Sequence, residues 1–128
     1  MNSINRRRFE RFQLKACYTP VSVRVVGSEN DALEGHAYDV SEGGAMFELD
    51  EPIEAGTPVA MQLTLPLSPG GSDLASARTI FVFGNVVWLD LSEPGPARMA
   101  IAFTQFAKLG DKERLLRQLG SGLYARAA

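Results

Sequence analysis

The amino-acid sequence predicts an all-β-dominated domain, a six-stranded antiparallel β-barrel with a flexible N-terminal arm and a C-terminal α-helix. Three observations lead to this prediction. Short runs of β-branched and other apolar residues alternate with polar ones, as in strands with one buried face. Hairpin-length turns rich in glycine, proline, aspartate and serine separate most of the runs. Near the end of the chain the apolar spacing changes to that of a helix.

The length of 128 residues, with 45% apolar and 22% charged residues, is typical of one globular domain. We expect an arm over residues 1–14, a barrel over 15–107, and a helix and tail over 108–128. No apolar run approaches the ~20 residues of a membrane span, and the N-terminal residues lack an apolar signal core. The single Cys17 excludes an internal disulfide. These features predict a cytoplasmic protein without direct membrane insertion.

Six strands are expected, over residues 16–26, 33–40, 45–49, 59–65, 79–89 and 98–103. In the first, Val21, Val23 and Val25 share one face. Pro20 in the same run predicts an edge strand or a bulge, because proline cannot donate a ladder hydrogen bond. Gly84 in the middle of the fifth run predicts a bend or bulge, as a curved sheet needs.

The fifth expected strand is also rich in aromatic residues. We expect Phe81, Phe83 and Trp88 to lie in the barrel core rather than to form a stacking surface for a ligand.

A helix is expected over residues 112–119, after the last strand. Asp111 is the candidate N-cap and Gly120 the candidate stop. The apolar stripe of this helix would consist of Leu115, Leu116 and Leu119.

The sequence offers no candidate catalytic residue and no metal site. It has no glycine-rich phosphate loop followed by lysine and serine or threonine, and no Gly-x-Gly-x-x-Gly opening a helix. A serine or cysteine nucleophile would need His36 as its base, and a lone histidine in a strand is typically structural. One histidine and one cysteine cannot build a Cys/His zinc site. We therefore expect a non-enzymatic protein without a cofactor.

The net charge of −2 conceals an asymmetry. Nine acidic residues lie between Glu29 and Glu54, and residues 25–77 contain no lysine or arginine. Five basic residues crowd the first fifteen positions, namely Arg6, Arg7, Arg8, Arg11 and Lys15. A local cation on an acidic body favours a small anionic partner over a nucleic-acid polymer, which usually binds a broad basic face.

The stretch from Asp39 to Gly44, Asp-Val-Ser-Glu-Gly-Gly, lies between two expected strands. Strand alternation puts Asp39 and Ser41 on one face, with Val40 on the other. These residue types are also those of an ordinary turn, so the stretch alone leaves both interpretations open. With Arg7 and Arg11 it could bind an anionic guanine nucleotide. Guanidinium groups pair with phosphate and with the O6/N7 edge of guanine, and a carboxylate accepts from the guanine N–H groups.

These motifs resemble those of the PilZ domains, which bind the bacterial second messenger cyclic di-GMP (c-di-GMP). The family signature is Arg-x-x-x-Arg, here Arg7 to Arg11, followed by Asp/Asn-x-Ser-x-x-Gly, here Asp39 to Gly44. Residues 84–88 resemble its Gly-x-Val-x-Trp strand and residues 99–103 its closing strand. Ala100 stands where the family usually has glycine.

The resemblance implies a stand-alone c-di-GMP receptor. Arg7 and Arg11 would hold phosphate and guanine, Asp39 and Ser41 a guanine, and Gly44 would shape the turn. An arginine at the position of Arg6 goes with two intercalated ligand molecules in similar proteins. The receptor would change its interaction with a downstream protein in motility, pilus, biofilm or exopolysaccharide control.

Two other functions stay open. PilZ-like chains without the arginine arm act as protein adaptors that do not bind the nucleotide. A small RNA-binding barrel would use the arm on a phosphate backbone, with a strong salt dependence. The protein would be a monomer or a homodimer.

Overall fold

The computed structural model describes residues 12–13, 19–65 and 78–120. Arg6, Arg7, Arg11 and Cys17 therefore lie outside the described residues. The strands are β1 (Phe12–Gln13), β2 (Pro20–Val25), β3 (Leu33–Ser41), β4 (Gly44–Leu49), β5 (Pro58–Thr64), β6 (Thr79–Asp90) and β7 (Ala97–Phe106). One helix, α2 (Asp111–Leu119), follows β7. Each strand and helix expected from the sequence has a counterpart here, with shifted ends.

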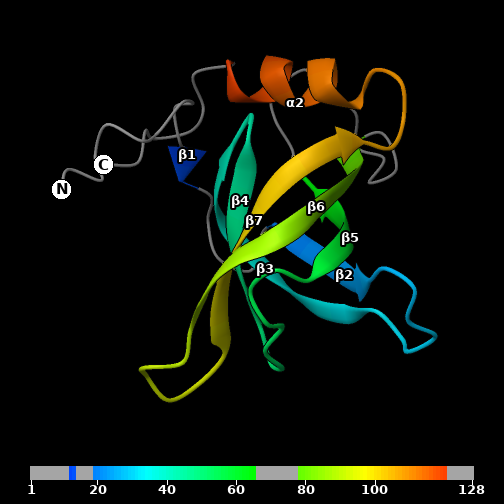
Figure 1. Ribbon diagram of the computed structural model, residues 1–128. Coiled ribbons are helices and arrows are strands. Elements are labelled where there is room, and N and C mark those ends of the chain that lie inside the picture. The colour runs from blue at the N-terminus through cyan, green and yellow to red at the C-terminus, as the bar shows by residue number, and fades with distance from the viewer. Residues whose placement is uncertain (1–11, 14–18, 66–77, 121–128) are drawn as a thin grey trace, which may run out of the picture.

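Strands β2 to β7 form a closed antiparallel barrel, as the sequence predicts. The order β3-β2-β5-β6-β7-β4 is closed by the pairing of β3 with β4. Strand β3 is long, and two strands, β2 and β1, pair along the same edge of it. Its first half pairs with β2, and its second half pairs with the short β1. Helix α2 lies across one end of the barrel (Figure 1).

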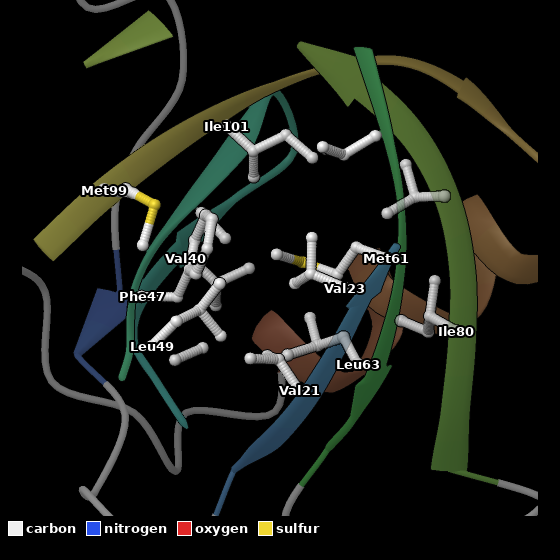
Figure 2. Close-up of a cluster of buried hydrophobic side chains, with 14 of the residues drawn as sticks. Val21, Val23, Val40, Phe47, Leu49, Met61, Leu63, Ile80, Met99 and Ile101 are labelled. Carbon is white, nitrogen blue, oxygen red and sulfur yellow. The ribbon is translucent and has the colours of Figure 1, made fainter. Parts of the chain in front are cut away.

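The inward faces of all six strands meet in one apolar core (Figure 2). On β2, Val21 and Val23 point inward, and strands β4, β5 and β6 alternate in the same way. Helix α2 contributes Leu115 and Leu119, which are both buried. The predicted stripe is thus correct except for Leu116, which is exposed.

Three register shifts bend the sheet. In β3, Ala37 lies opposite Phe47 while Asp39 lies opposite Met46, so Tyr38 is an extra residue. Strands β6 and β7 shift twice, between Phe83 and Gly84 and between Val86 and Trp88. The bend predicted at Gly84 is confirmed. An alanine side chain there would place Cβ 2.3 Å from the carbonyl oxygen of Ala102, which is sterically impossible without movement.

Two predictions about strand residues are wrong. Strand β2 is not an edge strand, because it pairs with β3 and with β5. Pro20 is tolerated because it is the first residue of the strand. The aromatic residues of β6 do not fill the core, since Phe83 and Trp88 are each 40% exposed and Phe81 is half-buried. The inward positions are taken by Ile80, Val82 and Val86.

Asp111 does not cap the helix. The N-cap position is occupied by Gly110, whose φ of 90° favours glycine, and no side chain caps α2. Asp111 is the first helical residue, and its carboxylate accepts a hydrogen bond from the Phe81 backbone N–H at 3.0 Å. Gly120 ends the helix as predicted and donates its N–H to the Leu116 carbonyl. Within the described residues, no helix is long and apolar enough to cross a membrane.

Candidate functional site

The candidate site is built around the tight turn between β3 and β4. Ser41 lies opposite Gly44, which leaves Glu42 and Gly43 as the two turn residues. The Ser41 hydroxyl accepts a hydrogen bond from the Gly43 N–H at 3.1 Å and donates to the Gly44 carbonyl at 3.5 Å. Ser41 is therefore a turn residue in its own right. The hydroxyl oxygen has a second lone pair, so it can still accept a bond from a ligand.

The extra residue Tyr38 decides which way Asp39 faces. Ala37 is in the core, and regular alternation would turn Asp39 inward as well. Because Tyr38 is inserted, Val40 takes the next core position, and Asp39 and Ser41 share the outer face. The face predicted for these residues is confirmed. Asp39 is only 9% exposed, although it lies outside the core, and β1 pairs directly beside it.

The outer face continues from Asp39 across three more strands. The pairing register aligns Asp39, Met46, Ala100 and Trp88 in one row, and Ser41, Gly44, Ala102 and Asn85 in the next. We call these eight residues the outer wall. The middle of the outer wall has mostly short side chains, because Gly44, Ala100 and Ala102 stand there. On the β6 side the wall carries the exposed ring of Trp88.

One residue of the outer wall, Trp88, faces the other way from the prediction. Trp88 was expected in the core, and only the inserted Val87 brings it to the outer face. A bulge of this kind leaves no clear trace in the apolar pattern, so the sequence does not reveal Trp88 as a site residue. Ala100, in place of the usual family glycine, does not interrupt β7, where it pairs with Met46 and Trp88.

Gly44 is needed for packing rather than for a positive φ. It is the first residue of β4 and lies in extended backbone. A Cβ atom at this position would lie 2.2 Å from the Ile101 carbonyl oxygen of β7. The neighbouring Gly43 carbonyl accepts a hydrogen bond from the Phe103 N–H at 2.8 Å. Strand β7 thus holds the turn closely from one side.

Charged groups around the turn are mostly acidic. Glu42 forms an ion pair with Lys112 of α2, with 3.5 Å between Oε2 and Nζ.

The phenol of Tyr38 has a raised pKa, chiefly because the side chain is partly buried. The guanidinium of Arg98 lowers this pKa, and the carboxylates of Glu48, Asp39 and Asp90 raise it further. Tyr38 therefore stays a neutral hydrogen-bond donor near the site at neutral pH. The described residues contain no group of three or more histidine, cysteine or acidic side chains that could hold a metal ion.

Strand β1 pairs with the end of β3 that leads into this turn. Phe12 lies opposite Val40, and Gln13 lies opposite Asp39. These are the described residues that follow directly on Arg11 in the sequence. The structure thus brings together Asp39, Ser41 and Gly44, three of the six site residues predicted from the sequence. Arg6, Arg7 and Arg11 belong to the part of the chain that it does not describe.

The chain is thus a small closed antiparallel barrel with a bulged strand that ends in Asp-x-Ser. The PilZ domain model matches residues 5–121, so the chain belongs to the PilZ family. No curated protein matches the sequence.

Several solved structures share the fold at low sequence identity. One is the PilZ domain of YcgR from Escherichia coli with c-di-GMP (17% identity, TM-score 0.63, 91% of this chain and 90% of that chain). Another is the inhibitor of motility MotI/DgrA from Bacillus subtilis (17%, TM-score 0.62, 91% and 53%). A third is MrkH from K. pneumonia in complex with c-di-GMP (19%, TM-score 0.60, 88% and 50%). The chain thus spans about half the length of MotI and MrkH.

Proposed function

We propose that this chain is a non-catalytic receptor for c-di-GMP, with the outer wall and the arginine arm as its binding site. The observation that carries the proposal is the pairing of β1 with the end of β3. Phe12 lies opposite Val40, and Arg11 is bonded to Phe12, so its Cα is about 3.8 Å from that of Phe12. Arg7 precedes Phe12 by five residues, a reach of up to about 18 Å. In this proposal both guanidinium groups would reach Asp39 and Ser41, as the chain length between them and Phe12 allows.

Each group has a role that its chemistry supports. Arg7 and Arg11 would bind phosphate oxygens or the O6/N7 edge of guanine in a bidentate manner. Asp39 would accept from the guanine N1–H and amino group, and Ser41 would add an acceptor beside it. Trp88, on the β6 side of the wall, offers an exposed ring on which a base can stack.

The charge distribution supports a ligand that carries both phosphate and guanine. Asp39 places a carboxylate beside the turn, which suits the N–H groups of a base better than a phosphate. The arm carries the opposite charge and suits the phosphates. Two of the structurally similar PilZ proteins were solved with c-di-GMP.

Binding would draw the arm onto the barrel and change the surface presented to a downstream protein, in motility, pilus, biofilm or exopolysaccharide control. In this proposal residues 1–128 act as one domain, with Gly44 shaping the turn and Arg6 promoting the binding of a second, intercalated ligand. The single cysteine fits a cytoplasmic receptor.

Isothermal titration of the full chain with c-di-GMP tests the proposal, with GTP and a short RNA titrated in parallel at two salt concentrations. We expect saturable binding of c-di-GMP alone, at micromolar concentration or below, with two ligands per chain if Arg6 acts as proposed. No heat with c-di-GMP would reject the receptor and favour a protein adaptor. Binding of the RNA with a steep salt dependence would favour the RNA-binding barrel.

A further inference from the structure

A second surface lies on the outer face of β2, β5 and β6, three strands that lie side by side (Figure 1). The register aligns Ser22, Gln62 and Phe81 in one row, and Arg24, Ala60 and Phe83 in the next. The residues between these rows, Val23, Met61 and Val82, belong to the core, so both rows face outward. We call this surface the β5 groove.

The β5 groove contains an open hollow of about 230 Å³. The hollow exists because Ala60 stands between the longer side chains of Arg24 and Phe83, and Ala32 and Ala107 also line it. Phe81 and Phe83 supply apolar walls, and Phe83 is 40% exposed. Adjoining exposed apolar groups with a polar rim are typical of an interaction surface. The hollow suits one large side chain of a protein partner, because it is too open to enclose a small ligand.

Two cationic side chains, those of Arg24 and Lys108, lie at this groove. Arg24 is exposed and forms no ion pair within the described residues. Lys108 lies over the ring of Phe81, with Nζ 4.1 Å from the ring centre. By contrast, Arg98 pairs with Glu48 and Lys112 pairs with Glu42. The nearby carboxylate of Glu34 accepts a hydrogen bond from Ser22 at 2.8 Å and does not pair with Arg24.

From these observations we infer that the β5 groove docks an acidic peptide segment of a partner protein. An aromatic or large aliphatic side chain of the segment fills the hollow over Ala60. Carboxylates on either side of it pair with Arg24 and Lys108, which gives the charge complementarity that steers and orients such complexes. The groove uses none of the residues assigned to nucleotide binding, so the inference stands independently of the c-di-GMP proposal.

The test uses three synthetic pentapeptides and the full chain labelled with nitrogen-15. The probe has phenylalanine flanked by two aspartates on each side, and the controls replace the phenylalanine by alanine or the aspartates by lysines. We expect the probe to shift the backbone amide signals of Ala60, Phe83 and Arg24 saturably, with at least fivefold weaker binding for either control. Absence of these shifts, or equal binding of the lysine peptide, would overturn the inference.

Variants separate the two parts of the groove. Ala60→Leu fills the hollow from an outward-facing position, and Arg24→Glu reverses the charge. Each substitution should lower the affinity for the probe peptide at least fivefold and leave the affinity for c-di-GMP unchanged. Arg117→Glu, an exposed change on α2, is the matched control and should have no effect. Sedimentation of the unmodified chain adds an independent check. A concentration-dependent dimer that Ala60→Leu abolishes would show that a second copy occupies the groove, and would reject an acidic partner.

Discussion

The carboxylate of Asp111 accepts a hydrogen bond from the backbone N–H of Phe81 at 3.0 Å, across 30 residues of sequence. Asp111 is 1% exposed, and its other oxygen lies 3.3 Å from Nη1 of Arg114 as an ion pair without hydrogen-bond geometry. Arg114 in turn donates to the Thr79 carbonyl at 3.2 Å. Together these contacts fasten the first turn of α2 to the start of β6.

We predict that Asp111→Ala lowers the free energy of unfolding by about 1–3 kcal/mol, because it leaves the Phe81 N–H without its partner. Urea denaturation followed by circular dichroism measures the change. Asp111→Asn retains a side-chain acceptor and should cost less. Glu113→Ala removes an exposed acid from the same helical turn and serves as the control, with an expected loss of about 0.3–1 kcal/mol. Equal stability of the Asp111→Ala and Glu113→Ala variants would contradict the fastening role.

Arg7→Ala and Arg11→Ala should each weaken c-di-GMP binding at least about tenfold. Hydrogen bonds to charged groups contribute roughly 1.5–3 kcal/mol, and about 1.4 kcal/mol corresponds to a factor of ten in affinity. Isothermal titration gives the affinities, and Arg117→Ala, which removes an exposed cation from α2, controls for the loss of one positive charge. Unchanged affinity in both arm variants would remove the arm from the site.

Trp88 provides a direct optical test of the outer wall, because it is the only tryptophan of the chain. We expect saturating c-di-GMP to change its fluorescence and to protect it from acrylamide quenching, since a base stacked on the ring excludes solvent. The same titration of Arg11→Ala should need at least tenfold more ligand. Unaltered emission at a concentration that titration calorimetry shows to be saturating would place the ligand elsewhere.

Gly44→Ala should destabilise the fold by about 1–3 kcal/mol, the usual cost of forcing extra atoms into a packed site. The added Cβ would lie 2.2 Å from the Ile101 carbonyl oxygen, so β4 and β7 must separate. Denaturant titration checks this. Gly120→Ala, where the nearest atom is 3.2 Å away, should change stability by about 0.5 kcal/mol or less. Similar effects of both substitutions would show that the close strand approach is not required.

Tyr38 should make stability fall at alkaline pH. Its pKa is raised above 10.0 in the folded chain, chiefly by burial, so ionisation is less favourable in the folded than in the unfolded state. The contribution of the neutral Tyr38 phenol to the free energy of unfolding is fully present below pH 10.0. It is lost as the pH rises through the pKa of Tyr38 in the folded chain. Phenolate absorbance should lose one ionisation step above pH 10.0 in Tyr38→Phe. Loss of a step at or below that pH would contradict the prediction.

The sequence predicted the strands well because apolar alternation reports directly which face of a strand is buried. It failed where tertiary contacts override local pattern. Asp111 was predicted as the N-cap because aspartate is common both at the N-cap and in the first turn of a helix. Only the position of β6 shows that its carboxylate binds the Phe81 N–H. Trp88 looks like a core residue because it is large and apolar, and the bulge at Val87 that turns it outward has no signal of its own.

Some residues of the candidate site could be predicted from the sequence, and others could not. Asp39, Ser41 and Gly44 could be found because their spacing forms a motif, and the structure brings them to one strand end. The contribution of Met46, Ala100 and Ala102 to the outer wall could not, since it depends on the register of strands far apart in sequence. Pro20 did not reveal whether its strand lies at an edge of the sheet. Proline is tolerated at the first position of an edge strand and of an interior strand alike.

Barrel closure also has a consequence for synthesis on the ribosome. A closed barrel needs β4 at residues 44–49 to pair with β7 at residues 97–106 as well as with β3, so it cannot form until most of the chain has emerged. Until then β4 keeps one edge without its partner strand, the kind of edge on which other chains can pair. Because pairings so distant in sequence also form slowly, the interval before β7 arrives is when a nascent chain is most exposed to aggregation and most dependent on chaperones.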